Sequence, residues 1–383
     1  MKKFEILLLL LCLYVSNLYS QIDYSFSGYV TNLPFYSVYN DELANLTGID
    51  KYQFADLTRL RLRPEIYLAS QTRINIEYEV DALYSKLNSF SFISQTSTNR
   101  QIVNLKWTVS DQNNLDVSDY IDRLYLRQGF DWGNITIGRQ RIAWGVGRVW
   151  SPTDLFNPIN PANFGKIEKD GADAASLTYS FGNFTDINLV YNPQEKLQTS
   201  NAGFRLRTNF DKYDFALIGG YFDQRIVAGG DFAGNFYDAG IRGEGIISFN
   251  KDDPDSNYVK FVFGMDNQFT SKLYALIEYQ FNGEGTANKL NYDLLGLLNG
   301  RIINLSRNYV DASITYQLTP LFTISLSNNS NLNDGSGYLS FTGTYSITDN
   351  SFATAGILTT YGNKFTEYSY YPSSLYLQGQ FFF

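Results

Sequence analysis

The sequence predicts an all-β protein, a transmembrane antiparallel up-and-down β-barrel of about 18 strands, and three observations support this fold class. Segments of about ten residues alternate apolar and polar side chains, as in RINIEYEVDAL (73–83) and YVKFVFGMDNQF (258–269). Short and long connections between such segments largely alternate, as expected when one end of a barrel carries tight turns and the other carries long loops. The chain finishes with SLYLQGQFFF (374–383), an alternating segment with a terminal aromatic residue.

The composition excludes most enzyme chemistry. The 383 residues carry a formal charge of −8, include no histidine, and have one cysteine, Cys12. Without histidine and a second cysteine, a Ser-His-Asp triad, a Cys-His pair and nearly all transition-metal sites are ruled out. We therefore expect no enzymatic activity, no cofactor, no metal site and no nucleic-acid partner.

The N-terminus, MKKFEILLLLLCLYVSNLYSQ, has the parts of a secretory signal peptide. Lys2 and Lys3 precede an apolar stretch that is shorter than the ~20 residues of a membrane-spanning helix, although a membrane anchor is the alternative. We predict a signal peptide over residues 1–20, cleaved before Gln21, and a barrel over residues 21–383. A barrel of this kind is expected in the outer membrane of a Gram-negative bacterium, in contact with its lipid.

The pattern predicts eighteen strands, an even number that puts both termini at the end with the short turns. The region RIVAGGDFAGNFY (225–237) could instead be one long loop, and sixteen strands would then remain. Either number leaves an aqueous lumen. The predicted spans are 22–37, 54–70, 72–86, 119–131, 134–145, 171–181, 185–193, 201–210, 213–224, 225–235, 238–249, 258–269, 273–283, 306–318, 321–333, 336–347, 351–362 and 373–383.

Arginines alternate with apolar residues on several predicted strands. In DLTRLRLRPEIYL (56–68), Arg59, Arg61 and Arg63 share one face. A charge that faces lipid near the bilayer midplane costs roughly 2–4 kcal/mol, so these side chains are predicted to face the lumen. Two readings stay open: a structural wall of ion pairs with neighbouring acids, or a basic lining that guides anions. The predicted lining residues are Arg59, Arg61, Arg63, Arg73, Arg123, Arg127, Arg139, Arg141, Arg148, Arg205, Arg207 and Arg242.

The region ITIGRQRIAWGVGRVWSPTDLFNPINPANFGKIEKDG (135–171) differs from the rest of the chain. Loops this long are usually functional, and residues 145–170 are predicted to fold inward as a constriction loop. Gly138 is expected at a kink or bulge. Plain alternation puts Arg139 and Arg141 on the apolar face of the strand, so a bulge has to intervene if they are to point inward.

The same region resembles a known family. GRQRIAWG, followed by an aspartate and by NPINP, is similar to a segment of alginate-export-type and related outer-membrane porins. The resemblance implies an eighteen-stranded monomeric barrel whose basic lumen passes anionic substrates. The signal ending in Ser-Gln and the Tyr/Asn-rich composition resemble proteins of Bacteroidota. The matching residues are Gly138, Arg139, Gln140, Trp144, Gly145, Asp154, Asn157 and Pro158.

The last predicted strand resembles the C-terminal signal that the barrel assembly machinery recognises, with Gly379, Phe381 and Phe383 on one face. Together these features predict a porin-like channel for passive diffusion of small, preferentially anionic solutes. The alternative is a non-conducting barrel that acts as a scaffold, an adhesin or an export partner, with its lumen closed by the loop 145–170.

Overall fold

The computed structural model describes residues 22–41, 44–45, 48–85, 100–112, 114–157, 168–298, 302 and 304–383. The predicted signal peptide lies outside the described residues, and so do parts of several predicted long loops. No helix in the described ranges is long and apolar enough to cross a membrane.

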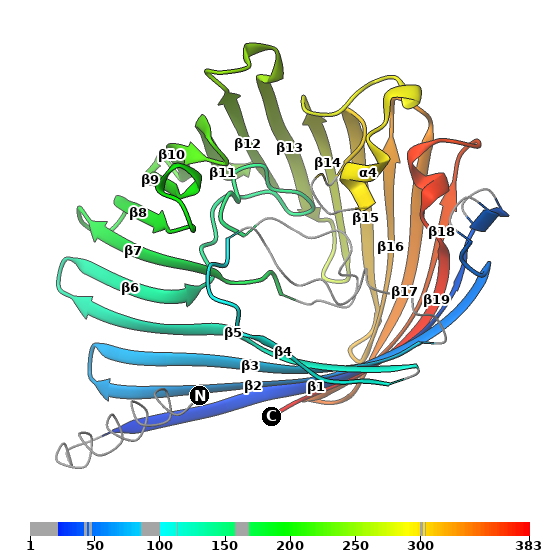
Figure 1. The fold of residues 1–383 in the computed structure, drawn as a ribbon, viewed down its shortest axis with the longest axis horizontal. Coiled ribbons are helices and arrows are strands. Elements are labelled where there is room, and N and C mark those ends of the chain that lie inside the picture. The colour runs from blue at the N-terminus through cyan, green and yellow to red at the C-terminus, as the bar shows by residue number, and fades with distance from the viewer. Residues whose placement is uncertain are drawn as a thin grey trace.

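One antiparallel sheet of nineteen strands runs through the described part of the chain, and it closes on itself because β1 pairs with both β2 and β19 (Figure 1). The strands are β1 (Asp23–Val38), β2 (Tyr52–Ala69), β3 (Thr72–Ser85), β4 (Lys106–Gln112), β5 (Leu115–Phe130), β6 (Gly133–Gln140), β7 (Ala172–Ser180), β8 (Asp186–Asn192), β9 (Asn201–Phe210), β10 (Tyr213–Phe222), β11 (Arg225–Phe236), β12 (Ala239–Phe249), β13 (Tyr258–Gln268), β14 (Leu273–Asn282), β15 (Asn308–Thr319), β16 (Phe322–Asn331), β17 (Ser336–Thr348), β18 (Ser351–Tyr361) and β19 (Ser373–Phe382).

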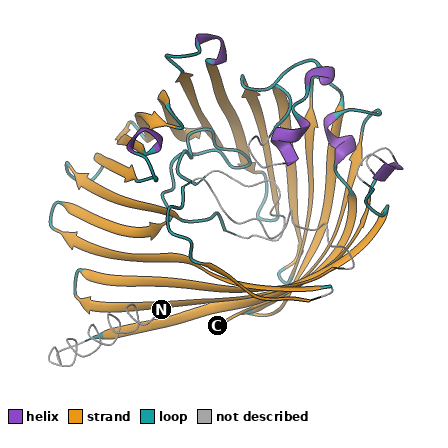
Figure 2. Cartoon of the chain, in the orientation of Figure 1, coloured by secondary structure: helices purple, strands orange, loops and turns teal. Residues whose placement is uncertain are grey.

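Helical structure in the described residues is confined to single turns between strands. They include η1 (Leu197–Thr199), η2 (Pro254–Ser256), η3 (Lys289–Asn291), α4 (Leu294–Leu298) and η4 (Glu367–Tyr370), and Asp41, Ala44 and Asn45 are helical as well. None of them forms a layer against the sheet (Figure 2). The prediction of an all-β barrel is confirmed.

The ring itself has eighteen strands, because β4 is a short addition. β5 pairs with β3 along one edge, whereas its other edge pairs with β4 over residues 115–120 and with β6 over residues 124–130. The prediction of eighteen strands is therefore confirmed, while the hairpin strand β4 was read as part of a loop. The alternative of sixteen strands is wrong, because β11 pairs along its length with both β10 and β12.

The outer surface of the ring is apolar. On β13, Val259, Phe261, Phe263 and Met265 are all more than a third exposed, whereas Val262 between them is only 2% exposed. So much exposed apolar area on one chain marks a surface that contacts lipid or a partner. The alternation of two therefore places apolar side chains outside and polar side chains inside, as the sequence predicts.

The two ends of the barrel differ. The short-turn end carries the termini and tight hairpins such as Asp211–Lys212, where both residues have positive φ (48° and 69°), as type I′ turns require. The long-loop end carries two short connections as well, at Asp223–Gln224 (φ 51° and 64°) and at residues 332–335. The alternation of short and long connections thus has exceptions between β10 and β11 and between β16 and β17.

The barrel wall is uneven in height. β1, β2, β3 and β5 have 14 to 18 residues, whereas β6, β7 and β8 have 7 to 9. The segment 100–105 runs over the short side: the Arg100 carbonyl accepts hydrogen bonds from Asp173 N (3.1 Å) and Asn192 Nδ2 (2.8 Å). The Arg100 guanidinium reaches Asp223 at 2.6 Å and so ties this rim to the β10–β11 turn.

At the long-loop end, Glu367 joins three connections. It is 1% exposed, and its carboxylate accepts hydrogen bonds from Tyr309 Oη (2.6 Å), Leu305 N (2.9 Å) and Asn331 Nδ2 (2.7 Å). Its own backbone N–H donates to Asp334 Oδ2 (2.8 Å). The loops around Leu305, Asp334 and Glu367 are therefore held together by one buried carboxyl group.

This carboxyl group makes the loop packing pH-dependent. Burial raises the pKa of Glu367 from 4.5 to about 7, and the nearby Asp334 carboxylate adds to the rise. Between those pH values the folded loops bind more protons than the unfolded ones, so their stability is greatest at low pH and falls as the pH rises through about 7. We expect the opening equilibrium of residues 363–372, measured by amide hydrogen exchange, to rise by up to about tenfold per pH unit in this window.

The variant Glu367→Gln is the matched neutral control for this prediction. It keeps an acceptor oxygen but has no proton to exchange, so the pH dependence should disappear. An unchanged pH dependence in Glu367→Gln would show that Glu367 is not its source.

Candidate functional site: the arginine-lined lumen and its inward loop

The first two arginines of β2 face acids on β3. Arg59 lies opposite Asp81 and donates to it from Nε (2.7 Å) and Nη2 (2.9 Å); its Nε also lies 2.9 Å from Glu79. Arg61 lies opposite Glu79, at 2.5 Å. Because these two arginines are at most 1% exposed, they contact acids rather than lumen water. Of the two readings, the structure shows the wall of ion pairs for Arg59 and Arg61.

Arg61 is surrounded by carboxylates from four positions. Glu77 (2.5 Å), Glu79 (2.5 Å) and Glu168 (3.4 Å) lie within ion-pair distance, and Asp122 contacts the same guanidinium. Asp122 is brought inward where the β3–β5 register shifts next to Glu77, as a β-bulge allows. Such a buried cluster needs its central cation, since an unpaired buried carboxylate is strongly unfavourable.

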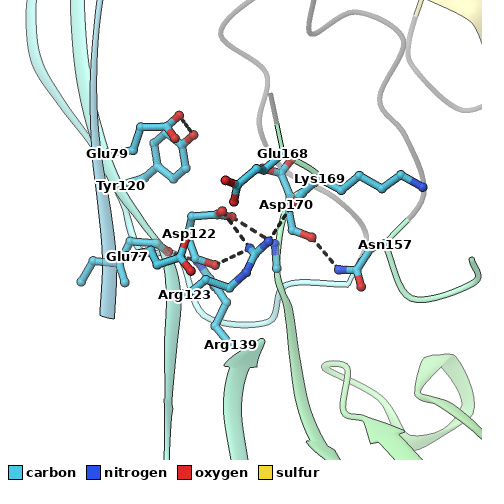
Figure 3. A network of polar contacts seen from close by, with 12 residues as sticks. Glu77, Glu79, Tyr120, Asp122, Arg123, Arg139, Asn157, Glu168, Lys169 and Asp170 are labelled. Carbon is cyan, nitrogen blue, oxygen red and sulfur yellow. Dashed lines mark hydrogen bonds and ion pairs between the residues drawn. The ribbon is translucent and has the colours of Figure 1, made fainter. Parts of the chain in front are cut away.

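The same cluster holds the returning end of the inward loop. Arg123 donates from Nη1 to the Asp122 carbonyl (2.9 Å) and from Nη2 to the Lys169 carbonyl (2.6 Å), as Figure 3 shows. Arg63 contacts Glu168 and lies with its guanidinium 5.1 Å from the centre of the Tyr29 ring. Arg63 and Arg123 therefore bind the loop to the wall.

The outgoing part of the loop packs on a small apolar core inside the barrel. Trp144 meets Phe156 edge-on, with ring centres 5.0 Å apart, and meets Phe222 of β10 at 6.3 Å. The Trp144 indole N–H donates to Asn188 Oδ1 (3.0 Å). The core continues onto the inner face of β8 to β12 with Val190, Ile218, Val227 and Ile246.

Two inward-facing glutamates hold the loop on the far side of the lumen. Glu244 of β12 accepts hydrogen bonds from Gly147 N (2.9 Å) and Thr153 N (3.4 Å), and it also contacts Val146 N. Glu278 of β14 accepts from the backbone N–H groups of residues 148–150 at 2.9 to 3.2 Å. A segment that starts at β6 thus crosses the interior to β12 and β14 (Figure 2).

The base of the loop is closed by two residues of the GRQRIAWG…D…NPINP region. Asp154 Oδ2 receives Arg141 Nη2 (2.9 Å) and Lys169 Nζ (2.5 Å), one from each end of the loop. Asn157 accepts from Ile142 N (2.7 Å) and donates to the Asp170 carbonyl (2.5 Å). Both side chains act as clamps between the outgoing and the returning chain. Pro158 lies outside the described residues.

Gly145 starts the inward path, and both its backbone conformation and its neighbours disfavour a larger residue. Its φ is +93°, and a Cβ would lie 2.1 Å from Ser151 Oγ and 2.6 Å from Glu244 Oε2. We expect Gly145→Ala to destabilise the barrel by roughly 1–3 kcal/mol in a urea unfolding titration, because both backbone strain and a clash arise. Gly335→Ala is the matched control, since φ there is +73° and nothing lies within 4 Å of an added Cβ. Equal losses in the two variants would show that strain alone, and not the loop's packing, is responsible.

Arg139 lies in the wall and not among the side chains around the lumen. Gly138 has the kink that the sequence predicts (φ +122°), but β6 stays in continuous register with β5 and β7. The register shift needed to turn Arg139 inward is therefore missing. Arg139 instead donates to Asp173 from Nε (2.7 Å) and Nη2 (3.0 Å) and to the Ile121 carbonyl (3.1 Å). It fastens β6 and β7 to the rim segment 100–105 through a contact with the Val103 carbonyl.

Five of the predicted arginines line one pocket of about 410 Å³ inside the barrel. Two carboxylates, Glu77 and Asp186, share the lining, so the lining side chains alone carry a formal excess of three positive charges. Three acids outside the lining, Asp122, Asp154 and Asp231, pair with Arg123, Arg141 and Arg205. Trp144 and Tyr125 add aromatic surface. The five arginines are Arg123, Arg127, Arg141, Arg205 and Arg207.

The remaining predicted arginines are spread over the lumen. Arg242 is buried beside Asp266, and Arg73 lies 3.9 Å from Glu65. Arg148 is exposed on the inward loop. Among the described residues, no acid lies within ion-pair distance of Arg127 or Arg148. Arg205 pairs with Asp231 (3.0 Å), and Arg207 pairs with Asp186 (2.6 Å).

Sequence reasoning missed the residues that position the loop. The alternation of their strands predicts that Glu278 and Glu244 face inward. The sequence does not predict that they hold the loop, because their partners are backbone amides more than 90 residues away in the chain. Arg100 gave no signal, since it belongs to a region that reads as an irregular loop.

The C-terminal residues complete the ring. Phe383 N donates to the Gly28 carbonyl (3.0 Å), and Gly28 N donates back to the Phe383 carbonyl (2.8 Å). Phe381 (50% exposed) and Phe383 (41% exposed) face outward, on the same side of the strand as Gly379. The last strand therefore presents aromatic side chains on the outer surface.

Comparison with solved structures identifies the fold. Over 94% of this chain and 96% of that one, the crystal structure of Acinetobacter baumannii OccAB1 aligns with a TM-score of 0.57 at 8% identity. Acinetobacter baumannii OccAB4 aligns with a TM-score of 0.56 at 11% identity, over 96% of this chain and 100% of that one. This chain has the fold of outer-membrane porins. Pseudomonas aeruginosa OccD3 (OpdP) aligns over 94% and 91% of the two chains, with a TM-score of 0.53 and 10% identity.

Sequence comparison adds no closer relative. No known family profile matches the chain, and no curated protein sequence matches it. The eighteen-stranded porin fold and the exposed apolar outer face together place the protein in an outer membrane.

Proposed function

We propose that the protein is a porin-like channel for passive diffusion of small solutes, with a preference for anions. The observation that carries this proposal is the pocket of five arginines and two carboxylates inside an eighteen-stranded barrel. In a narrow passage with low-dielectric walls, an excess of positive charge raises the local concentration of anions. Arginine is suited to this role because it stays charged and binds carboxylate or phosphate groups with two donors.

The opposite side of the lumen supports passage of polar molecules. On β15 to β18, hydroxyl side chains alternate with exposed apolar residues such as Ile314, Leu326 and Phe341. Pairs of these hydroxyls hydrogen-bond across strands at 3.0 Å, as in Thr315–Ser325 and Thr344–Thr354. Among the described inward residues of β15 to β18, the acid Asp311 is buried against Gln280 and Asn329, and the others are uncharged. The polar residues of this face include Ser313, Thr315, Ser325, Ser327, Thr342, Thr344 and Thr354.

The resemblance of residues 138–158 to alginate-export-type porins favours sugar acids as one class of anionic solute. The described residues of that region form the loop base and the inward path, which is what a constriction of the lumen needs. We further propose the outer-membrane lipid and the barrel assembly machinery as partners, the latter through Gly379, Phe381 and Phe383.

A second candidate is a non-conducting barrel that serves as a scaffold, an adhesin or an export partner. The crossing of the lumen by residues 144–157, fixed at Glu244 and Glu278, favours it. A loop held on both sides of the lumen could close the passage.

Liposome swelling separates these candidates. Proteoliposomes with the refolded protein are placed in isotonic solutions of similar-sized solutes, namely an uncharged sugar, its uronic acid and its amino sugar. We expect swelling with all three and a several-fold faster rate for the uronic acid. Heat-modifiable electrophoretic mobility verifies that the barrel is folded. If the liposomes with this folded barrel swell no faster than protein-free liposomes, the channel proposal is wrong and the closed barrel is supported.

A further inference from the structure

Two inward-facing arginines lie directly opposite each other near the short-turn end. Arg73, the second residue of β3, is the register partner of Arg127 on β5. Directly opposite residues of an antiparallel pair have Cβ atoms about 4.5–5.5 Å apart, and like charges at that distance repel. A natural barrel that keeps such a pair in its wall needs something to offset the repulsion.

Protein groups do not supply enough negative charge. The acid nearest to Arg73 is Glu65, at 3.9 Å, and its two oxygens already accept hydrogen bonds from Tyr67 Oη (2.6 Å) and Asn75 Nδ2 (2.9 Å). Arg127 has no acidic partner among the described residues. The other acid near this pair, Glu77, lines the same pocket as Arg127 but is paired with Arg61 at 2.5 Å. Both nearby carboxylates are therefore bound to other groups.

The hydroxyl groups of Tyr125 and Thr136 beside this arginine pair can donate hydrogen bonds. Tyr125 lies one inward position from Arg127 on β5, opposite Asn75, and its hydroxyl makes no hydrogen bond with the described residues. Thr136 of β6 is the register partner of Arg127 on its other side. Arg127, Tyr125 and Thr136 all line the arginine pocket, so a solute in that pocket can reach them. Arg73 is a third exposed, which leaves its donors accessible.

We propose that Arg73 and Arg127, with the Tyr125 hydroxyl, form a binding site for a single oxyanion group, a carboxylate or a phosphate, at the short-turn end of the lumen. The two planar guanidinium groups offer paired donors to the two or more oxygens of such a group. The bound anion replaces the missing acid and offsets the repulsion between the arginines. This inference rests on the proposed function, because it names where a permeating anion pauses before it leaves the arginine pocket.

Block of single-channel current tests the site. Inorganic phosphate and, separately, malonate are added at constant ionic strength to either side of a planar bilayer that contains the refolded full-length barrel. We expect concentration-dependent interruptions, stronger from the short-turn side, with a half-blocking concentration at least tenfold higher in Arg127→Gln and in Arg73→Gln. Lys272→Gln removes the same charge at a turn of the same end and should stay within twofold of the wild type. Changes below twofold in both arginine variants, or an equal change in Lys272→Gln, would overturn the site.

A thermal melt keeps this test separate from the channel proposal. At fixed ionic strength, replacing chloride by phosphate should raise the Tm of the wild type and leave that of Arg127→Gln unchanged, whether or not the barrel conducts. In chloride, Arg127→Gln should be no less stable than the wild type, because a like-charge contact is removed. If phosphate raises the Tm of a barrel that does not conduct, the proposed function is wrong but the anion site is supported. A loss of stability in Arg127→Gln that is equal in chloride and phosphate would make Arg127 a structural residue and overturn the site.

Discussion

Replacing Arg61 with methionine is expected to lower the free energy of unfolding by roughly 3–5 kcal/mol, because it removes the cation at the centre of a buried cluster. Arg61 is 0% exposed and lies within ion-pair distance of Glu77, Glu79, Asp122 and Glu168. Without its charge these carboxylates face one another, and two of them, Glu79 and Asp122, are fully buried. A urea titration of the barrel in lipid vesicles, followed by tryptophan fluorescence, measures the loss.

Arg207→Met is the control for this prediction. Arg207 also pairs with an acid, Asp186 at 2.6 Å, but its side chain is 52% exposed, so water screens the pair. Exposed ion pairs contribute about 0–1 kcal/mol, and the control should lose no more than that. Similar losses in Arg61→Met and Arg207→Met would contradict the view that Arg61 serves stability while Arg207 faces solvent.

Removing both lumen glutamates is expected to widen the passage. Glu244 and Glu278 together accept hydrogen bonds from six backbone N–H groups of the inward loop. In the double variant Glu244→Ala/Glu278→Ala these amides lose their acceptors, and the loop leaves the far wall. Single-channel conductance should rise at least twofold, and larger polyethylene glycols should enter the pore.

The apolar core of the loop should limit the movement to the part of the loop that crosses the lumen. Trp144 and Phe156 still pack on Phe222, so the loop base should stay in place and only its crossing part should move. Glu284→Ala removes an acid that pairs with Lys260 at 2.6 Å at the long-loop end, and it should leave conductance unchanged. An unchanged conductance in the double variant would show that the loop does not limit the pore.

The fold was predictable because its signal is local. Val259, Phe261, Phe263 and Met265 recur at every second position of β13, and in the barrel these four side chains form part of the exposed outer face. The region 225–237 was the weakest prediction, since its glycines dilute the pattern. It nonetheless forms β11, which pairs on both edges. β4 was missed because it is short and lies inside a region that reads as a loop.

The site was predictable only in part, because ion pairing depends on register. Alternation alone puts Arg59, Arg61 and Arg127 on inward faces, yet the first two meet acids and the third meets Arg73. A one-residue shift between β3 and β5 brings Asp122 inward, and no pattern in the sequence marks that shift. The loop clamps Asp154 and Asn157 were noticed as part of a motif, while their task follows from contacts between the two ends of the loop.

The central claim is that the pocket arginines give the lumen a preference for anions, and the reversal potential tests it most directly. The refolded protein is held in a planar bilayer under a KCl gradient, and the wild type is compared with the triple variant Arg127→Gln/Arg205→Gln/Arg207→Gln. We predict an anion-selective reversal potential for the wild type and a shift toward cation selectivity in the variant, where Asp186 and Asp231 are left unpaired. A cation-selective wild type, or equal potentials for the two proteins, would contradict the account.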